Sequence, residues 1–192
     1  MTEIYNPYNI LVHIDGARLS NACVTLNKTF QELTSDLGVD VVSFGGTKNG
    51  LLMGEAILVL NTELAKISRQ KLKYIRKQSA QLPSKTRFIA AQFNRYLENK
   101  LYRDIAEHSC LMAEKLHQGL KTIPQIQLTA NRQSNAVFAI IPKEWIKLIR
   151  EKYFFYVWNE KTYECRLMMS WDTKKEEVDD FIQQLLQLSQ KT

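Results

Sequence analysis

Two apolar runs near the N-terminus, each ending in a polar turn, constrain the fold of this chain most strongly. Residues 9–15 form the first run, which ends in His13-Ile14-Asp15-Gly16-Ala17-Arg18. Residues 39–44 form the second run, which ends in Ser43-Phe44-Gly45-Gly46-Thr47-Lys48-Asn49-Gly50. Short apolar runs of this kind are typical of strands that are buried on both faces of a parallel sheet.

The residues between the two runs have the spacing of a helix. Apolar side chains recur there at helical intervals as far as Gly38, where a helix is expected to stop: Leu19, Cys23, Leu26, Phe30 and Leu33. A strand, a helix and a strand in this order predict a β-α-β unit with a right-handed crossover. Because ligands bind at the carboxyl ends of such strands, we expect Asp15, Arg18 and Lys48 to share one site.

The rest of the chain predicts an antiparallel strand, a helical region and a second small domain. Glu55–Leu60 makes a third strand, and its short link favours an antiparallel return. Residues 62–119 have a helical pattern with a break at residues 82–84, so a long linking helix is expected to start at Lys85. Beyond it the patterns predict an α+β domain, with strands at Ile126–Thr129, Ala136–Ile141, Tyr153–Trp158 and Glu164–Met169 and helices at Lys143–Arg150 and Lys174–Leu188. We therefore expect domains at residues 1–84 and 85–192.

Composition indicates a soluble, cytoplasmic protein. Of the 192 residues, 45% are hydrophobic and 24% are charged, which is typical of globular domains. No apolar stretch approaches the roughly 18 to 20 residues of a membrane span, and the N-terminus lacks the pattern of a secretion signal. The three cysteines, Cys23, Cys110 and Cys165, are an odd number and lack the close spacing of a zinc site or a disulfide framework. We therefore expect them to be reduced residues of the core or its boundary, and we predict no metal site.

Positive charge is concentrated in the middle of the chain. The formal net charge is +6, and residues 64–97 contain nine Lys or Arg and no Asp or Glu. A solvated helical face is the commoner explanation of such a run. The alternative is a nucleic-acid-binding module that uses the basic face of residues 66–95, although no RNA-binding aromatic motif is present.

The polar residues at the two predicted strand ends suit a particular chemistry. A lysine that forms an imine with an aldehyde needs a neutral amine, which burial or nearby positive charge favours. Lys48 follows two glycines, where the backbone can approach a bound ring closely. Asp15 is placed to pair with a ring nitrogen, and Arg18 can bind an oxygen or a carboxylate through its planar fork. Taken singly, an aspartate often caps a turn and a lysine in a loop is often solvated, but together they favour a site.

These two motifs resemble those of low-specificity L-threonine aldolases, which are pyridoxal-phosphate enzymes of fold type I. The match lies in HIDGAR and SFGGTKNG, separated by a strand and a helix, and it continues more weakly through Cys165–Thr173. The resemblance implies that Lys48 binds the cofactor covalently and that Asp15 pairs with the pyridine nitrogen. It also implies that Arg18 contacts the cofactor oxygen and the substrate, and that Arg166 binds the substrate carboxylate.

The same resemblance predicts roles for three further basic residues. His13 belongs to the cofactor-binding motif and lies two positions from Asp15, so on a strand it shares a face with that acid and is able to orient it. Lys85 and Arg87 lie in a region that approaches the active site of a neighbouring subunit in similar enzymes, which implies a homo-oligomer.

The resemblance covers the later part of such an enzyme. It implies the C-terminal part of a fold-type I large domain, a β-α-β unit plus an antiparallel strand, followed by a small α+β domain. The implied activity is cleavage of L-threonine or a related β-hydroxy-α-amino acid to glycine and an aldehyde, in a complex with a missing N-terminal half. Without that half, the sheet would have unpaired edges. The alternative is a non-catalytic remnant that retains the fold and serves in assembly with a partner.

Overall fold

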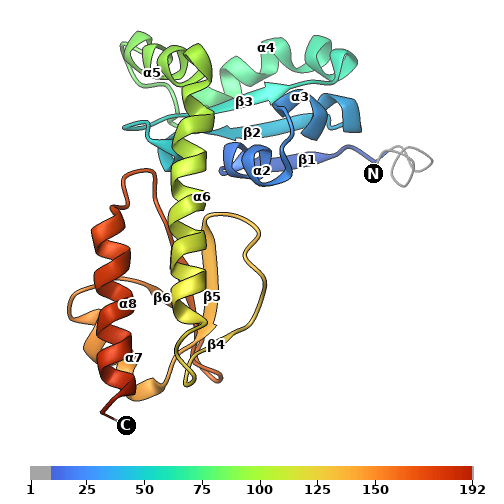
Figure 1. The fold of residues 1–192 in the computed structure, drawn as a ribbon. Coiled ribbons are helices and arrows are strands. Elements are labelled where there is room, and N and C mark those ends of the chain that lie inside the picture. The colour runs from blue at the N-terminus through green and yellow to red at the C-terminus, as the bar shows by residue number, and fades with distance from the viewer. Residues whose placement is uncertain (1–9, 192) are drawn as a thin grey trace. The chain divides into compact units, whose positions relative to one another are not determined.

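The structure, a computed structural model, describes residues 10–191. The chain divides into two compact units between Asp104 and Ile105, within helix α6 (Leu101–Leu120) (Figure 1). The division expected after Ser84 stays a prediction.

The first unit contains a three-stranded sheet in the order β1-β2-β3. Strands β1 (His13–Gly16) and β2 (Val41–Gly45) are parallel, and β3 (Glu55–Val59) runs antiparallel to β2. The predicted parallel pair and antiparallel return are therefore confirmed. The first strand is shorter than predicted, because Ile10 and Leu11 precede it and are 53% and 60% exposed. Asn9 lies outside the described residues.

The crossover between β1 and β2 is broken into shorter pieces than the single helix predicted. It consists of α2 (Leu19–Leu26), α3 (Phe30–Leu33) and a 3-10 turn (Ser35–Leu37). Asn27 ends α2 in the left-handed region with φ 49°, a conformation that asparagine adopts more readily than most residues. Thr29 then starts α3 with a capping box to Glu32.

The core of the first unit is rich in aromatic rings. Phe44 of β2 packs edge-on against Phe30, with 5.1 Å between the ring centroids, and Phe30 lies 4.4 Å from Tyr102. Tyr96 of α5 (Arg87–Leu97) is 2% exposed, and its hydroxyl hydrogen bonds to Ser20 at 2.5 Å. Burial raises the pKa of Tyr96 to about 12. These contacts bury one face of β2, whereas Val41 and Ser43 on the other face are only partly buried.

The helical region contains the predicted break but not the predicted long helix. Helix α4 (Thr62–Gln78) ends before the break, and α5 begins after it. A 3-10 turn (Glu98–Lys100) separates α5 from α6, and Asn99 and Lys100 have φ values of 51° and 61°. The helix expected to run from Lys85 is therefore two helices with a kink, because left-handed residues interrupt the helical hydrogen bonds.

The second unit is the predicted α+β domain. Its antiparallel sheet has the order β4-β5-β7-β6, formed by β4 (Gln127–Leu128), β5 (Ala136–Ile140), β6 (Tyr156–Asn159) and β7 (Glu164–Met168). Helices α7 (Lys143–Arg150) and α8 (Lys175–Ser189) lie close to their predicted bounds. The core contains Leu116, Leu120, Val137, Trp145 and Leu185 among others.

Candidate active site

His13, Asp15 and Ser43 lie on the face of the parallel strand pair that is turned away from the aromatic core. Asp15 and Ser43 are directly opposite each other in the β1–β2 register. The His13 ring nitrogen Nε2 hydrogen bonds to Ser43 Oγ at 2.9 Å. Alternate residues of β2, Val42 and Phe44, are buried on the other side. The motif histidine is thus tied to the neighbouring strand beside the predicted cofactor acid.

Asp15 has one oxygen engaged and one uncommitted. Its Oδ1 accepts a hydrogen bond from the Ala17 N–H at 3.0 Å, which is the turn-capping role that an aspartate often has. Its Oδ2 accepts no hydrogen bond from residues 10–191, and the side chain is exposed. Capping the turn and pairing with a ligand cation are therefore compatible in this residue.

Lys48 lies in a 3-10 turn (Thr47–Asn49) that follows β2 directly. The turn is tied to β3, since Thr47 Oγ1 accepts a hydrogen bond from the Gly54 N–H at 3.0 Å. The Lys48 side chain is exposed, and within residues 10–191 it forms no hydrogen bond or ion pair. The enclosing pocket expected for an imine-forming lysine is therefore not formed by the described residues, whereas the amine itself is accessible.

The turns that follow β1 and β2 are in direct contact. A Cβ on Gly45 would lie 2.6 Å from the Ala17 Cα, so only glycine permits this approach of the two backbones. Asn49 is 3% exposed, and its Nδ2 donates to the carbonyls of Ala17 (3.0 Å) and Gly45 (2.8 Å). The segments carrying Asp15 and Lys48, which are distant in sequence, therefore meet at the same strand ends.

Sequence reasoning missed Ser43 and Asn49. Both belong to the second polar motif, and the two-residue period of the strand was the signal that could have placed Ser43 on the face of Asp15. No local pattern indicates the long-range bonds of Asn49. Arg18, in contrast, lies where it was expected, half-buried at the start of α2, where its carbonyl accepts from the Asn21 N–H at 3.1 Å.

Arg166 lies in the second unit, in the middle of strand β7. It pairs in register with Phe138 on one side and Tyr156 on the other. Its guanidinium carbon lies 5.1 Å from the centre of the Trp158 ring. The Arg166 Nε is buried and has no hydrogen-bond partner among the described residues. A buried donor of this kind is costly to leave unpaired, so the site suits an anionic ligand such as a carboxylate.

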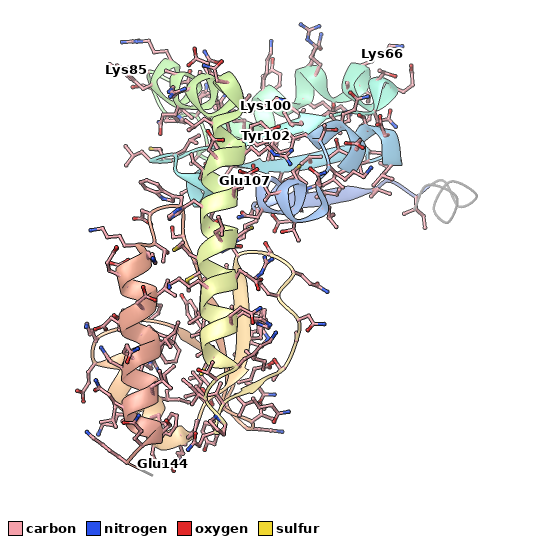
Figure 2. The ribbon with its side chains drawn as sticks, viewed as in Figure 1. Lys66, Lys85, Lys100, Tyr102, Glu107 and Glu144 are labelled. Atoms are coloured by element: carbon pink, nitrogen blue, oxygen red, sulfur yellow. The ribbon has the colours of Figure 1, made fainter. Side chains whose placement is uncertain are left out.

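The basic segment is a largely exposed surface. No residue of α4 is buried, and residues 71–88 are all exposed. Lys66 on α4 pairs with Glu63 at 2.7 Å and projects outward (Figure 2). Lys85 and Arg87 are exposed at the start of α5, and the Arg87 guanidinium lies 4.8 Å from the Phe88 ring centre. Their predicted contact with a neighbouring subunit stays a prediction.

Cys23, Cys110 and Cys165 are buried and form no disulfide, as predicted. Burial raises the pKa of the Cys23 and Cys165 thiols to about 11. Within residues 10–191, no helix is both long enough and apolar enough to cross a membrane. The same residues contain no group of three or more His, Cys, Asp or Glu side chains arranged to hold a metal ion.

Comparison with known proteins identifies the family. Residues 1–143 match the family described as Beta-eliminating lyase. The chain belongs to the beta-eliminating lyase family. It is 38% identical over 167 residues to the low specificity L-threonine aldolase of Pseudomonas sp. (strain NCIMB 10558), and the match covers 87% of this chain and 47% of that protein. The chain thus spans about half the length of the curated relatives it matches.

Solved structures of this fold agree with the family. A threonine aldolase from Leishmania major superposes with a TM-score of 0.85 at 27% identity, covering 98% of this chain and 54% of that chain. A tryptophan decarboxylase from Catharanthus roseus has a TM-score of 0.72 at 14% identity, covering 100% of this chain and 45% of that chain, and shows the fold alone. The predicted fold type I and the resemblance to threonine aldolases are confirmed. The individual roles of Lys48, Asp15, Arg18, His13 and Arg166 stay predictions.

Proposed function

We propose that this chain supplies the lysine, the acid and the substrate arginines of a pyridoxal-phosphate lyase that cleaves L-threonine or a related β-hydroxy-α-amino acid to glycine and an aldehyde. One observation carries the proposal: the turns bearing Asp15 and Lys48 meet at the carboxyl ends of two parallel strands. The substrate class is suggested by the relatives, which are named low specificity L-threonine aldolase.

The residues present fit the cofactor. The exposed, unpaired Lys48 amine is available to condense with an aldehyde. Asp15 keeps one carboxylate oxygen for the hydrogen of a protonated ring nitrogen. When bound, the pyridine ring supplies a sink for the electrons released at the substrate α-carbon.

In the reaction, the residues of this chain bind, orient and hold a proton. Asp15 keeps the ring nitrogen protonated by pairing its negative charge with that N–H. The Ala17 N–H holds the other Asp15 oxygen and so fixes the direction of the carboxylate. His13 hydrogen bonds to Ser43, the residue opposite Asp15, and so lies on the same face as this acid. Arg18 contacts the cofactor oxygen and the substrate, and Arg166 binds the substrate carboxylate, whose two oxygens match its planar fork.

The working site includes a second polypeptide segment, either an N-terminal half or a neighbouring subunit. Among the described strands, β1 and β3 each pair only with β2, so each has one unpaired edge. Several apolar residues on or next to these strands are exposed: Ile10, Leu11, Ile57 and Leu58. Unpaired edges and exposed apolar side chains are typical places for another chain to add. A second segment that covers the sheet would also shield the exposed Lys48 amine from solvent.

The test is turnover by a reconstituted complex. The chain is co-expressed with the N-terminal half of the Pseudomonas relative, pyridoxal phosphate is added, and glycine and acetaldehyde released from L-threonine are measured. We expect turnover that disappears in Lys48→Ala and persists in Lys161→Ala, an exposed lysine of the second unit. Turnover that survives Lys48→Ala would refute the proposal. A stable complex with no turnover would favour the non-catalytic assembly partner instead.

A further inference from the structure

Asn49 links the two turns that carry the candidate cofactor-binding residues. Its side chain is almost completely buried, and both of its hydrogen bonds reach beyond its own turn. Nδ2 donates to the carbonyl of Ala17, which follows β1, and to the carbonyl of Gly45, which ends β2. Both N–H groups of the amide therefore serve the junction of the two strand ends.

The turn around Lys48 is closed without this side chain. The backbone N–H groups of Asn49 and Leu51 both donate to the Gly46 carbonyl, at 2.9 and 3.3 Å. Gly50 ends the turn in the left-handed region with φ 94°. Thr47 ties the turn to β3. The Asn49 amide therefore contributes little to the shape of the turn, and its bonds set where the turn sits relative to β1.

We propose that Asn49 is a positioning residue that holds Lys48 at a fixed reach from Asp15. The inference rests on the proposed function, in which one rigid ring is bonded to the Lys48 amine at its aldehyde carbon and paired with Asp15 at its nitrogen. Two anchors on a rigid ligand act together only when their separation is fixed in advance. If the turn carrying Lys48 drifts away from β1, each anchor still works alone but the two no longer work together.

The probe is pyridoxal phosphate with cyanoborohydride, which transfers a hydride to the carbon joined to the condensed amine and fixes the pyridoxyl group there. Peptide mass spectrometry gives the ratio of label at Lys48 to label at the exposed Lys161. The chain is labelled alone and with the N-terminal half of the Pseudomonas relative. We expect a high ratio in the native chain, lowered about tenfold in Asn49→Ala, since losing one or two buried hydrogen bonds corresponds to about that factor.

Two further Asn49 variants separate geometry from side-chain volume. Asn49→Asp keeps the size but places carboxylate oxygens against the Ala17 and Gly45 carbonyls, so we expect a ratio at least as low as in Asn49→Ala. Asn49→Ser keeps one hydroxyl donor, and we expect an intermediate ratio. Because stability is expected to fall in the same order, the ratios are compared only between variants that circular dichroism shows to be folded.

Asn61→Ala is the matched control. Asn61 is also a bridging asparagine, and its Nδ2 donates to Asp40 at 2.6 Å at the opposite end of the same sheet. We expect Asn61→Ala to lower the melting temperature without changing the labelling ratio. If folded Asn49 variants have the same ratio of Lys48 to Lys161 label as the native chain, this inference is overturned and the proposed function is unaffected. No preference for Lys48 in the native chain, in either preparation, would overturn the proposed function and this inference with it.

Discussion

Replacing Gly45 by alanine tests the contact between the two strand ends. The added Cβ would lie 2.6 Å from the Ala17 Cα and 2.7 Å from its carbonyl oxygen, about 1 Å closer than ordinary van der Waals contact. Both atoms are backbone, so neither side yields by a change of rotamer. Overpacking of this kind costs about 1–3 kcal/mol, and the smaller flexibility of alanine in the unfolded chain returns about 0.4–1 kcal/mol. We expect the free energy of unfolding of the first unit to fall by about 1–2 kcal/mol. For a unit of this size, this corresponds to a melting temperature lower by about 10 °C.

The three tryptophans allow this loss to be assigned to the first unit. Trp145, Trp158 and Trp171 all lie in the second unit. Urea unfolding is therefore followed by tryptophan fluorescence for the second unit and by far-ultraviolet circular dichroism for both. We expect Gly45→Ala to shift the circular dichroism transition and not the fluorescence transition.

Gly38→Ala is the control for Gly45→Ala. Gly38 has φ 70°, so alanine there is strained, but the position precedes β2 at the far end from the strand-end contact. We expect Gly38→Ala to destabilise the first unit to a similar extent and to leave Lys48 labelling unchanged, whereas Gly45→Ala lowers both. An unchanged or raised stability in Gly45→Ala would refute the account of this contact.

Three further predictions concern other parts of the chain. In the reconstituted enzyme, we expect Trp158→Ala to raise the KM for the amino acid about two- to fivefold with little change in kcat, because a partly exposed cation–π contact that holds Arg166 is worth about 0.5–1 kcal/mol. Trp158→Phe should restore most of the native KM. A fall in kcat alone would contradict this role of Trp158. Burial holds the pKa of His117 below its ordinary 6.5, so the unfolded chain takes up the proton first and the second unit loses stability as pH falls below about 6.5. His117→Gln should flatten that dependence in urea titrations, and an unchanged slope would contradict it. If the exposed basic surface is simply solvated, reversing its charge leaves oligonucleotide binding weak and unaltered, which filter binding at several salt concentrations checks with Lys71→Glu, Lys73→Glu and Arg76→Glu.

The sequence predicted the parts of the fold that depend on local patterns. Continuous apolar runs located both parallel strands, and a short link indicated the antiparallel return. Strand and helix patterns located nearly all elements of the second unit, since burial leaves a direct record in the sequence. Two breaks were missed, at Asn27 and at Asn99 with Lys100, because left-handed residues other than glycine carry little local signal. The first strand was predicted too long for a different reason. Apolar residues such as Ile10 indicate a buried strand, but in residues 10–191 Ile10 is exposed and precedes β1.

The candidate site was predictable to the same degree. The motifs located Asp15, Arg18 and Lys48 at strand ends, because the carboxyl ends of parallel strands gather polar turns. The His13–Ser43 and Asn49 bonds were not predictable, since they join residues about 30 positions apart through a register that the sequence does not specify. The register also brings Phe138 and Tyr156 to either side of Arg166.

The central claim is that Lys48 and Asp15 act on one pyridoxal phosphate ring, and the absorption spectrum of the reconstituted complex tests it most directly. We expect a visible band when pyridoxal phosphate is added, absent in Lys48→Ala, present in Lys161→Ala, and altered in its pH dependence in Asp15→Asn because the ring nitrogen then loses its negative partner. A visible band that is the same in Lys48→Ala and in the native complex would contradict the account.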